Sequence, residues 1–199
     1  MLEYLVIVGA IASILGTSKY IVETLQGRTK PNRVSWLLWS IAPLVASAAA
    51  FLDGVTWAAL PVFMAGFCPL LVLIASFSNK KAFWKLGTFD YLCGFFSVLA
   101  LVLWALTKQP GAAIVFAIIS DAFAAIPTLQ KTWAHPGTES HWAYFAGLFN
   151  AITGLLVIKS WVFPEYAFLA YLVIMNSLLL FSIFGKGIMM PRPAKGSGK

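Results

Sequence analysis

The sequence predicts an all-α membrane protein of seven spanning helices, arranged as two parallel three-helix repeats joined by a linker helix. The prediction rests on composition, on the spacing of the apolar runs and on the placement of the basic residues. Of 199 residues, 60% are hydrophobic and only 11% are charged, whereas a water-soluble domain carries roughly 25% charged residues. Most side chains must therefore face lipid. The formal charge of +7 does not indicate nucleic acid, because the basic residues do not cluster with aromatic or polar partners.

Seven apolar runs follow one another, each close to the roughly 20 residues that a spanning helix needs. We expect helices, because the strict alternation of transmembrane β-strands is absent. We also expect no separate soluble domain, and a retained first span in place of a cleaved signal peptide, since the first run lacks a basic start and a cleavage site. The runs are Leu2 to Gln26, Val34 to Leu52, Val55 to Phe77, Phe89 to Leu106, Gly111 to Leu129, Trp142 to Ile158 and Trp161 to Phe184.

The loops predict the orientation, because cytoplasmic loops carry an excess of Lys and Arg. Eleven of the 14 basic residues follow the first, third, fifth and seventh runs. The opposite loops hold only Lys108 and Lys159, beside Asp53 and Glu165. We therefore expect an integral membrane protein with its N-terminus outside and its C-terminus in the cytoplasm.

A short repeat links the two halves of the chain. The residues Thr-Leu-Gln end the first run at positions 24–26 and the fifth run at 128–130, and a proline, a serine and a tryptophan follow each copy. A three-helix unit ends on the far side of the membrane, so a fourth helix must return the chain before a second unit inserts in the same sense. The predicted units are residues 1–78 and 110–188, with a linker loop and helix at 79–109 and a disordered cytoplasmic tail at 189–199.

The 3+1+3 layout, the basic loops after the first and fifth runs and the stretch Gly147-Leu148-Phe149-Asn150 resemble the SWEET and PQ-loop superfamily. That superfamily includes sugar transporters, lysosomal amino-acid exporters and the KDEL receptor. The resemblance covers the whole chain as architecture but few positions as sequence, and no Pro-Gln dipeptide occurs. It implies a solute site near the membrane midplane. Pro127 and Pro43 match two of the four prolines typical of the sugar transporters, and each is a candidate hinge because proline removes a helical hydrogen bond.

Asp121 lies near the middle of the fifth run, where a charge costs about 2.5–3.5 kcal/mol on insertion scales. Such a carboxyl group tends to face the bundle interior or a wet cavity, and desolvation favours its neutral form. A protonation switch is therefore predicted. The resemblance implies the same, since some PQ-loop exporters are proton-coupled through a carboxylate in the fifth helix. The alternative is a protonated Asp that bonds to a neighbouring helix.

Two pairs of polar residues inside the apolar runs are further candidates. Lys19 and Glu23 lie one turn apart on the first run, where they could neutralise each other in a gate or simply reach the interface. Asn150 and Asn176 need partners within the bundle, either a solute or a neighbouring helix. The resemblance favours Asn176, because span-seven asparagines line the sugar site of the SWEET family.

Trp39, Ser40 and Tyr144 complete the candidate binding residues, as sources of stacking and hydroxyl groups, with ordinary packing as the alternative. No catalytic residue, metal or cofactor is predicted. His135 and His141 do not have the spacing of a standard zinc site, and the two cysteines lie in apolar runs.

These features predict a transporter for a small solute, such as a sugar, an amino acid or a vitamin-like nucleoside, that works by alternating access with optional proton coupling through Asp121. The alternative is a ligand-binding membrane receptor of the KDEL-receptor type without transport. An enzyme ranks last, because Asp90 and Asp121 lie at different depths and no nucleophile elbow or phosphate loop occurs. The expected partners are the solute and the lipid bilayer, and a homo-oligomer is left open.

Overall fold

The computed structural model describes residues 4–52, 59–82, 84–107 and 110–189. Within these ranges the chain forms seven α-helices and a short 3-10 helix, with no strand, so the prediction of an all-helical fold is confirmed. Asp53, Lys108 and nearly all of the expected tail lie outside the described residues. The elements are α1 (Tyr4–Leu25), α2 (Arg33–Leu52), α3 (Leu60–Ser78), α4 (Thr88–Thr107), α5 (Pro110–Ala134), η2 (Pro136–Thr138), α6 (Trp142–Leu156) and α7 (Phe163–Met189).

Several helix boundaries differ from the expected ones, and two of these differences have local reasons. α3 begins at Leu60, with Pro61 in its first turn, where the missing N–H of proline has no helical partner to lose. α5 continues past Leu129 to Ala134. The Thr132 hydroxyl donates to the Thr128 carbonyl at 2.9 Å, so a polar side chain bonds along the helix. Lys131 consequently lies in the last turn of α5 instead of in a loop.

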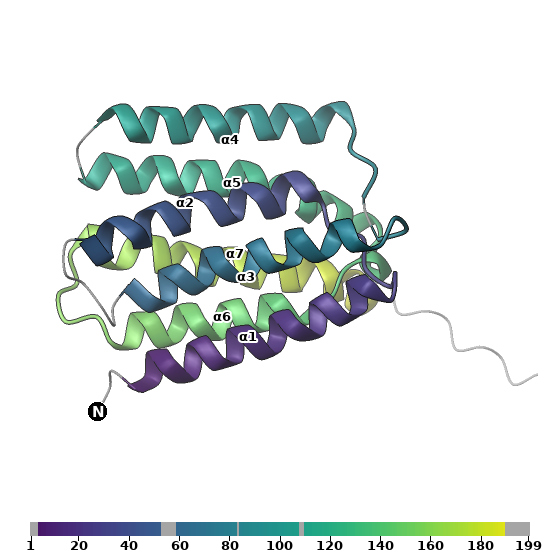
Figure 1. The fold of residues 1–199 in the computed structure, drawn as a ribbon, viewed down its shortest axis with the longest axis horizontal. Coiled ribbons are helices and arrows are strands. Elements are labelled where there is room, and N and C mark those ends of the chain that lie inside the picture. The colour runs from purple at the N-terminus through teal and green to yellow at the C-terminus, as the bar shows by residue number, and fades with distance from the viewer. Residues whose placement is uncertain (1–3, 53–58, 83, 108–109, 190–199) are drawn as a thin grey trace, which may run out of the picture.

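The helices form one bundle in which successive helices run in alternating directions (Figure 1). α3 packs against both α1 and α2, and α7 packs against both α5 and α6. These two groups, α1 to α3 and α5 to α7, meet where α1 packs on α6 and where α2 packs on α5. α4 lies at the edge of the bundle against α5 and α2 (Figure 1). The other six helices therefore surround the centre of the molecule, whereas α4 lies outside this ring of helices.

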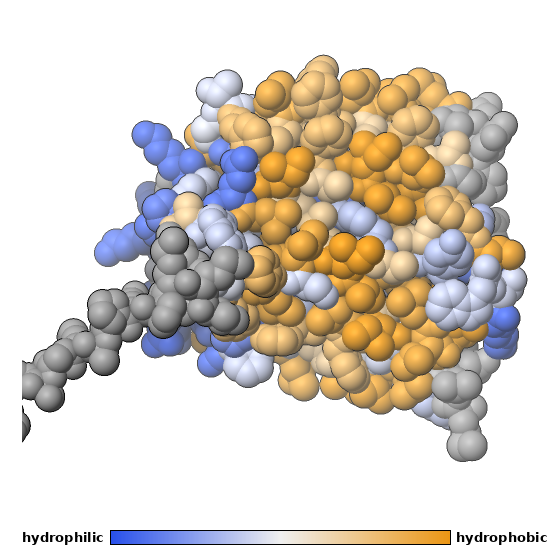
Figure 2. Space-filling model, turned by 180° about the vertical axis from the view of Figure 1, so that it is seen from behind, coloured by the Kyte–Doolittle hydropathy of each residue, from blue (hydrophilic) through white to orange (hydrophobic). Residues whose placement is uncertain are grey.

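The outer surface is compatible with an integral membrane protein. α1, α3, Ile114–Ala134 of α5 and Phe163–Gly185 of α7 are long and apolar enough to cross a membrane. α2, α4 and α6 contain shorter apolar stretches. Figure 2 shows a broad hydrophobic band between two more hydrophilic ends. Large apolar side chains such as Phe95 and Ile174 are exposed, and exposed apolar surface of this extent suits lipid and not water.

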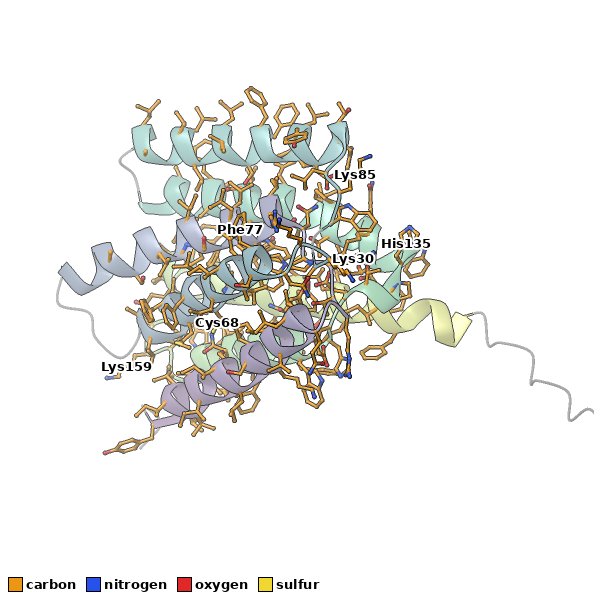
Figure 3. The ribbon with its side chains drawn as sticks, turned by 45° about the vertical axis from the view of Figure 1, so that its right-hand side comes forward. Lys30, Cys68, Phe77, Lys85, His135 and Lys159 are labelled. Atoms are coloured by element: carbon orange, nitrogen blue, oxygen red, sulfur yellow. The ribbon has the colours of Figure 1, made fainter. Side chains whose placement is uncertain are left out.

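The ends of the bundle differ in charge. The loops α1–α2, α3–α4 and α5–α6 meet at one end, which we call the basic end, and Lys30, Lys85 and His135 lie there (Figure 3). Lys159, between α6 and α7, lies at the opposite end (Figure 3). The N-terminal end of α7 also lies there, with Glu165 in its first turn.

Candidate functional site

A cavity of about 80 Å³ lies at the centre of the bundle and is lined by residues from every helix except α4. A single water needs only about 10–15 Å³ on this kind of measure, so the cavity has room for several waters or a small solute. Five of the residues predicted from the sequence line it, and they come from α2, α5, α6 and α7. They are Trp39, Asp121, Tyr144, Asn150 and Asn176.

Asp121 faces this cavity from α5 and is 6% exposed. Its Oδ2 accepts a hydrogen bond from the Tyr171 hydroxyl of α7 at 2.8 Å. Its backbone carbonyl accepts a hydrogen bond from Trp39 Nε1 of α2 at 3.3 Å. Among the residues that line the cavity, Asp121 is the only acid and none is basic. A carboxyl group in such surroundings is stable when it is neutral or when a cation accompanies it.

One buried polar atom of a residue that lines the cavity has no hydrogen-bond partner among the described residues. Asn150 is 1% exposed; its Nδ2 donates to the Pro61 carbonyl at 2.9 Å, but its Oδ1 has no donor. Trp36 also lines the cavity, and its indole packs against Tyr20, with ring centroids 4.9 Å apart. Because buried polar groups are normally paired, the unpaired Asn150 oxygen indicates water or a ligand there.

Three aromatic rings form the wall of the cavity toward the basic end. Trp36 and Tyr144 are nearly parallel, with centroids 6.2 Å apart and an interplanar angle of 27°. Trp39 is almost perpendicular to both, at 83° to Trp36 and 84° to Tyr144. These rings come from the first two turns of α2 and the first turn of α6, so both helix groups contribute to the wall.

A buried polar cluster, consisting of Tyr20, Lys131, Glu139 and Tyr144, lies beyond that wall. Lys131 of α5 forms an ion pair with Glu139, and the two side chains are 1% and 0% exposed. The Tyr20 hydroxyl of α1 donates to Glu139 Oε1, and the Tyr144 hydroxyl of α6 donates to the same oxygen at 3.1 Å. We call this set the basic-end cluster. It joins α1, α5 and α6 through one carboxylate.

Two further hydrogen bonds to backbone carbonyls connect the loops at the basic end. Lys131 Nζ also donates to the Lys30 carbonyl at 2.6 Å. The Lys30 N–H in turn donates to the Thr138 carbonyl at 2.8 Å. The loop after α1 is thereby bonded to the loop after α5. The central cavity is closed at the basic end by polar contacts between the two helix groups.

The opposite end is hollow. A second cavity of about 180 Å³ is lined there by residues of α2, α3, α5 and α7, among them Pro43, Ser47 and Glu165. Like the central cavity, it is bordered by both helix groups.

The remaining sequence-predicted residues lie away from the central cavity. Ser40 is buried and donates to a carbonyl of its own helix at 2.6 Å. Lys19 is exposed and Glu23 is half-buried on α1. Of the candidate hinges, Pro127 is buried within α5 and Pro43 lines the second cavity.

The residues around His135 and His141, which were not predicted as a metal site, have other partners. No group of three metal-ligating side chains occurs among the described residues, and Glu139 pairs with Lys131. The His135 ring packs against Trp84 at 5.7 Å. Asp90 accepts hydrogen bonds from Asn32 at 2.5 Å and from the Gly87 N–H at 2.6 Å at the start of α4, so it shares no partner with Asp121.

Sequence analysis did not single out Tyr171, Tyr20, Trp36 or the Lys131–Glu139 pair as site residues. Tyr171 is 50 positions from Asp121, and Tyr20 is 119 positions from Glu139, so no spacing rule connects them. The one local signal was the opposite charges of Lys131 and Glu139 on either side of a short loop.

Comparison with family models, with curated proteins and with solved structures finds no match. The function is therefore argued from the geometry of the chain itself.

Proposed function

We propose that this protein is a small-solute membrane transporter in which two three-helix units rock around the central cavity. The observation that carries the proposal is a cavity bordered by both helix groups, closed at one end by polar contacts between them and followed by a second hollow at the other end. Alternating access requires such a site, with barriers that form and break between two rigid units.

The packing order supports two parallel repeats with seven spanning helices. In each group the third helix packs against the other two, and the α1–α6 contact has a counterpart in the α2–α5 contact. A two-fold axis along the bundle that exchanges α1 with α5 and α2 with α6 also exchanges these two contacts. The proposal therefore includes the 3+1+3 architecture of the SWEET and PQ-loop superfamily.

In this proposal the basic end faces the cytoplasm, following the positive-inside bias. The closed barrier is then cytoplasmic and the second cavity faces outside, so the structure corresponds to an outward-facing state. Opening inward requires the basic-end cluster to break and the second cavity to close. Pro43 and Pro127 are suited to bending, because each lies within a helix and leaves one carbonyl without its helical partner.

Crosslinking the two loops at the basic end tests alternating access. In proteoliposomes, the double variant Lys30→Cys with Thr138→Cys should lose flux after treatment with a short bis-thiol crosslinker or oxidant and regain it on reduction, because the backbone bond between these residues brings the loops together. Each single variant is the control and should keep its flux. Unchanged flux in the crosslinked protein would refute a moving barrier at this end. The assay uses labelled glucose, alanine, nicotinamide riboside and choline as probes.

Asp121 is the proposed coupling residue. Asp121→Asn should abolish pH-driven uptake while the protein stays folded, since the amide oxygen can still accept the hydrogen bond from Tyr171. Uptake is measured with and without an imposed pH gradient. Coupling that survives the substitution would remove this role. Stabilisation by a ligand without any flux would instead favour a receptor of the KDEL-receptor type.

A further inference from the structure

We propose that the central cavity binds a small organic cation, and that this cation and a proton occupy Asp121 in turn. The inference rests on the proposed function, because it names the solute class of the same cavity. Two features of the cavity carry it: its single charge and its aromatic wall.

The charge of the lining selects against anions. Asp121 is the only charged side chain among the residues that line the cavity. Beyond the aromatic wall, the buried Lys131 is engaged by Glu139 and by the Lys30 carbonyl. An ionised Asp121 therefore lacks a protein counter-charge, and a buried carboxylate without one is strongly disfavoured. A cationic solute supplies that counter-charge, and a proton is the alternative when the site is empty.

The aromatic wall suits the same kind of ligand. Cations are attracted to the faces of Trp and Tyr rings within about 6 Å of the centroid. Trp36, Trp39 and Tyr144 all line the cavity, and Trp39 stands at 83° and 84° to the other two. Because the rings differ in orientation, a cation in the cavity can approach this corner of aromatic side chains from more than one direction. Trp39 also donates to the Asp121 carbonyl, so the corner and the carboxyl group are adjacent.

Competition with a proton follows from what surrounds Asp121. Tyr171 of α7 bonds to it, Trp39 of α2 lies against it, and Ser97 of α4 bonds to the adjacent Ser120. Tyr144 of α6 and Cys68 of α3 are the other titratable side chains that line the cavity, and α1 contributes only Ser13 and Thr17. None of these groups is cationic, so protonation of Asp121 removes the charge that the cation needs. Cation affinity should consequently fall as the pH falls.

A pair of matched ligands tests the charge requirement. Choline and 3,3-dimethyl-1-butanol have the same shape and hydroxyl group, but only choline is charged. In the purified full-length protein, choline should raise the melting temperature and the neutral alcohol should not. Asp121→Asn should lower choline affinity by about 10-fold or more, in keeping with the loss of a desolvated ion pair. Equal stabilisation by the two ligands, or undiminished choline binding to the variant, would overturn the proposal.

Binding and flux together separate this inference from the proposed function. Choline binding without flux in proteoliposomes would support the cation site and overturn the transporter. Flux of glucose, alanine or nicotinamide riboside without choline binding would overturn the cation site and leave the transporter standing.

Discussion

Lys131 and Glu139 show, at the scale of single residues, how a mostly apolar bundle holds a buried charge. Their side chains are almost completely excluded from solvent, and two tyrosine hydroxyls from different helices donate to the same carboxylate oxygen. Removing one partner of such a pair leaves the other as an uncompensated buried charge, whereas replacing both can be nearly neutral. A single substitution should therefore destabilise the protein much more than the double substitution does.

We expect Lys131→Met to destabilise the protein by about 3–5 kcal/mol, because Glu139 then loses its counter-charge. Adding Glu139→Gln should restore much of the loss, since the amide oxygen still accepts from Tyr20 and Tyr144. Thermal unfolding of the two variants beside the unaltered protein measures the difference. If Lys131→Met unfolds at the same temperature as the unaltered protein, the ion pair does not stabilise the closed end.

The contact between α1 and α6 is the clearest case at the scale of the element. This contact joins the two helix groups and depends on small residues that let the backbones approach closely. A Cβ atom at Gly16 would lie 2.4 Å from Ala146 Cβ and 2.6 Å from the Trp142 carbonyl oxygen. A Cβ atom at Gly9 would lie 2.2 Å from Thr153 Oγ1. Neither position has room for even one methyl group.

Gly16→Ala should destabilise the protein by about 1–3 kcal/mol, the usual cost of overpacking, because α1 must move away from α6. Gly137→Ala is the control, since a Cβ there meets nothing within 4 Å, and its effect should stay within about 0.5 kcal/mol. Both variants are compared by thermal unfolding in the same detergent. Equal stabilities would mean that the α1–α6 contact tolerates separation.

At the scale of the whole molecule, the proposed mechanism depends on which end faces the cytoplasm. Lys81 is exposed at the basic end, and Lys159 is exposed at the opposite end. Both cysteines of the chain, Cys68 and Cys93, are buried and free. Introduced surface thiols can therefore be distinguished from the native ones.

A membrane-impermeant maleimide should label Lys159→Cys in intact cells, because this loop is expected outside. The same reagent should label Lys81→Cys only after the membrane is permeabilised. The unaltered protein measures the background from the buried cysteines. The reverse pattern would place the basic end outside and would make the closed barrier an external one.

The helices themselves could be predicted from the sequence. An α-helix is stabilised by hydrogen bonds between residues four apart, and lipid demands about 20 apolar residues for each crossing, so both signals are local. The fourth expected run, Phe89 to Leu106, differs by one residue at each end from α4 (Thr88–Thr107). The distribution of charge is also a local property of the sequence, so the basic loops could be predicted from the sequence alone. Asp121 was identified in the same way, because a carboxyl group in the middle of an apolar run has a high free energy of insertion into the membrane.

Only the tertiary structure decided which side chains meet. Lys19 and Glu23 obey the one-turn spacing of a helical pair, yet they lie outside the residues that line the central cavity. Asn150 bonds to the carbonyl of Pro61, 89 positions away. The Asp121 carboxyl group accepts a hydrogen bond from Tyr171, which lies on a different helix, α7. Such contacts depend on which helices pack together and on the rotation of each about its axis. Periodicity reports neither, because lipid-facing and bundle-facing surfaces of a membrane helix are both largely apolar.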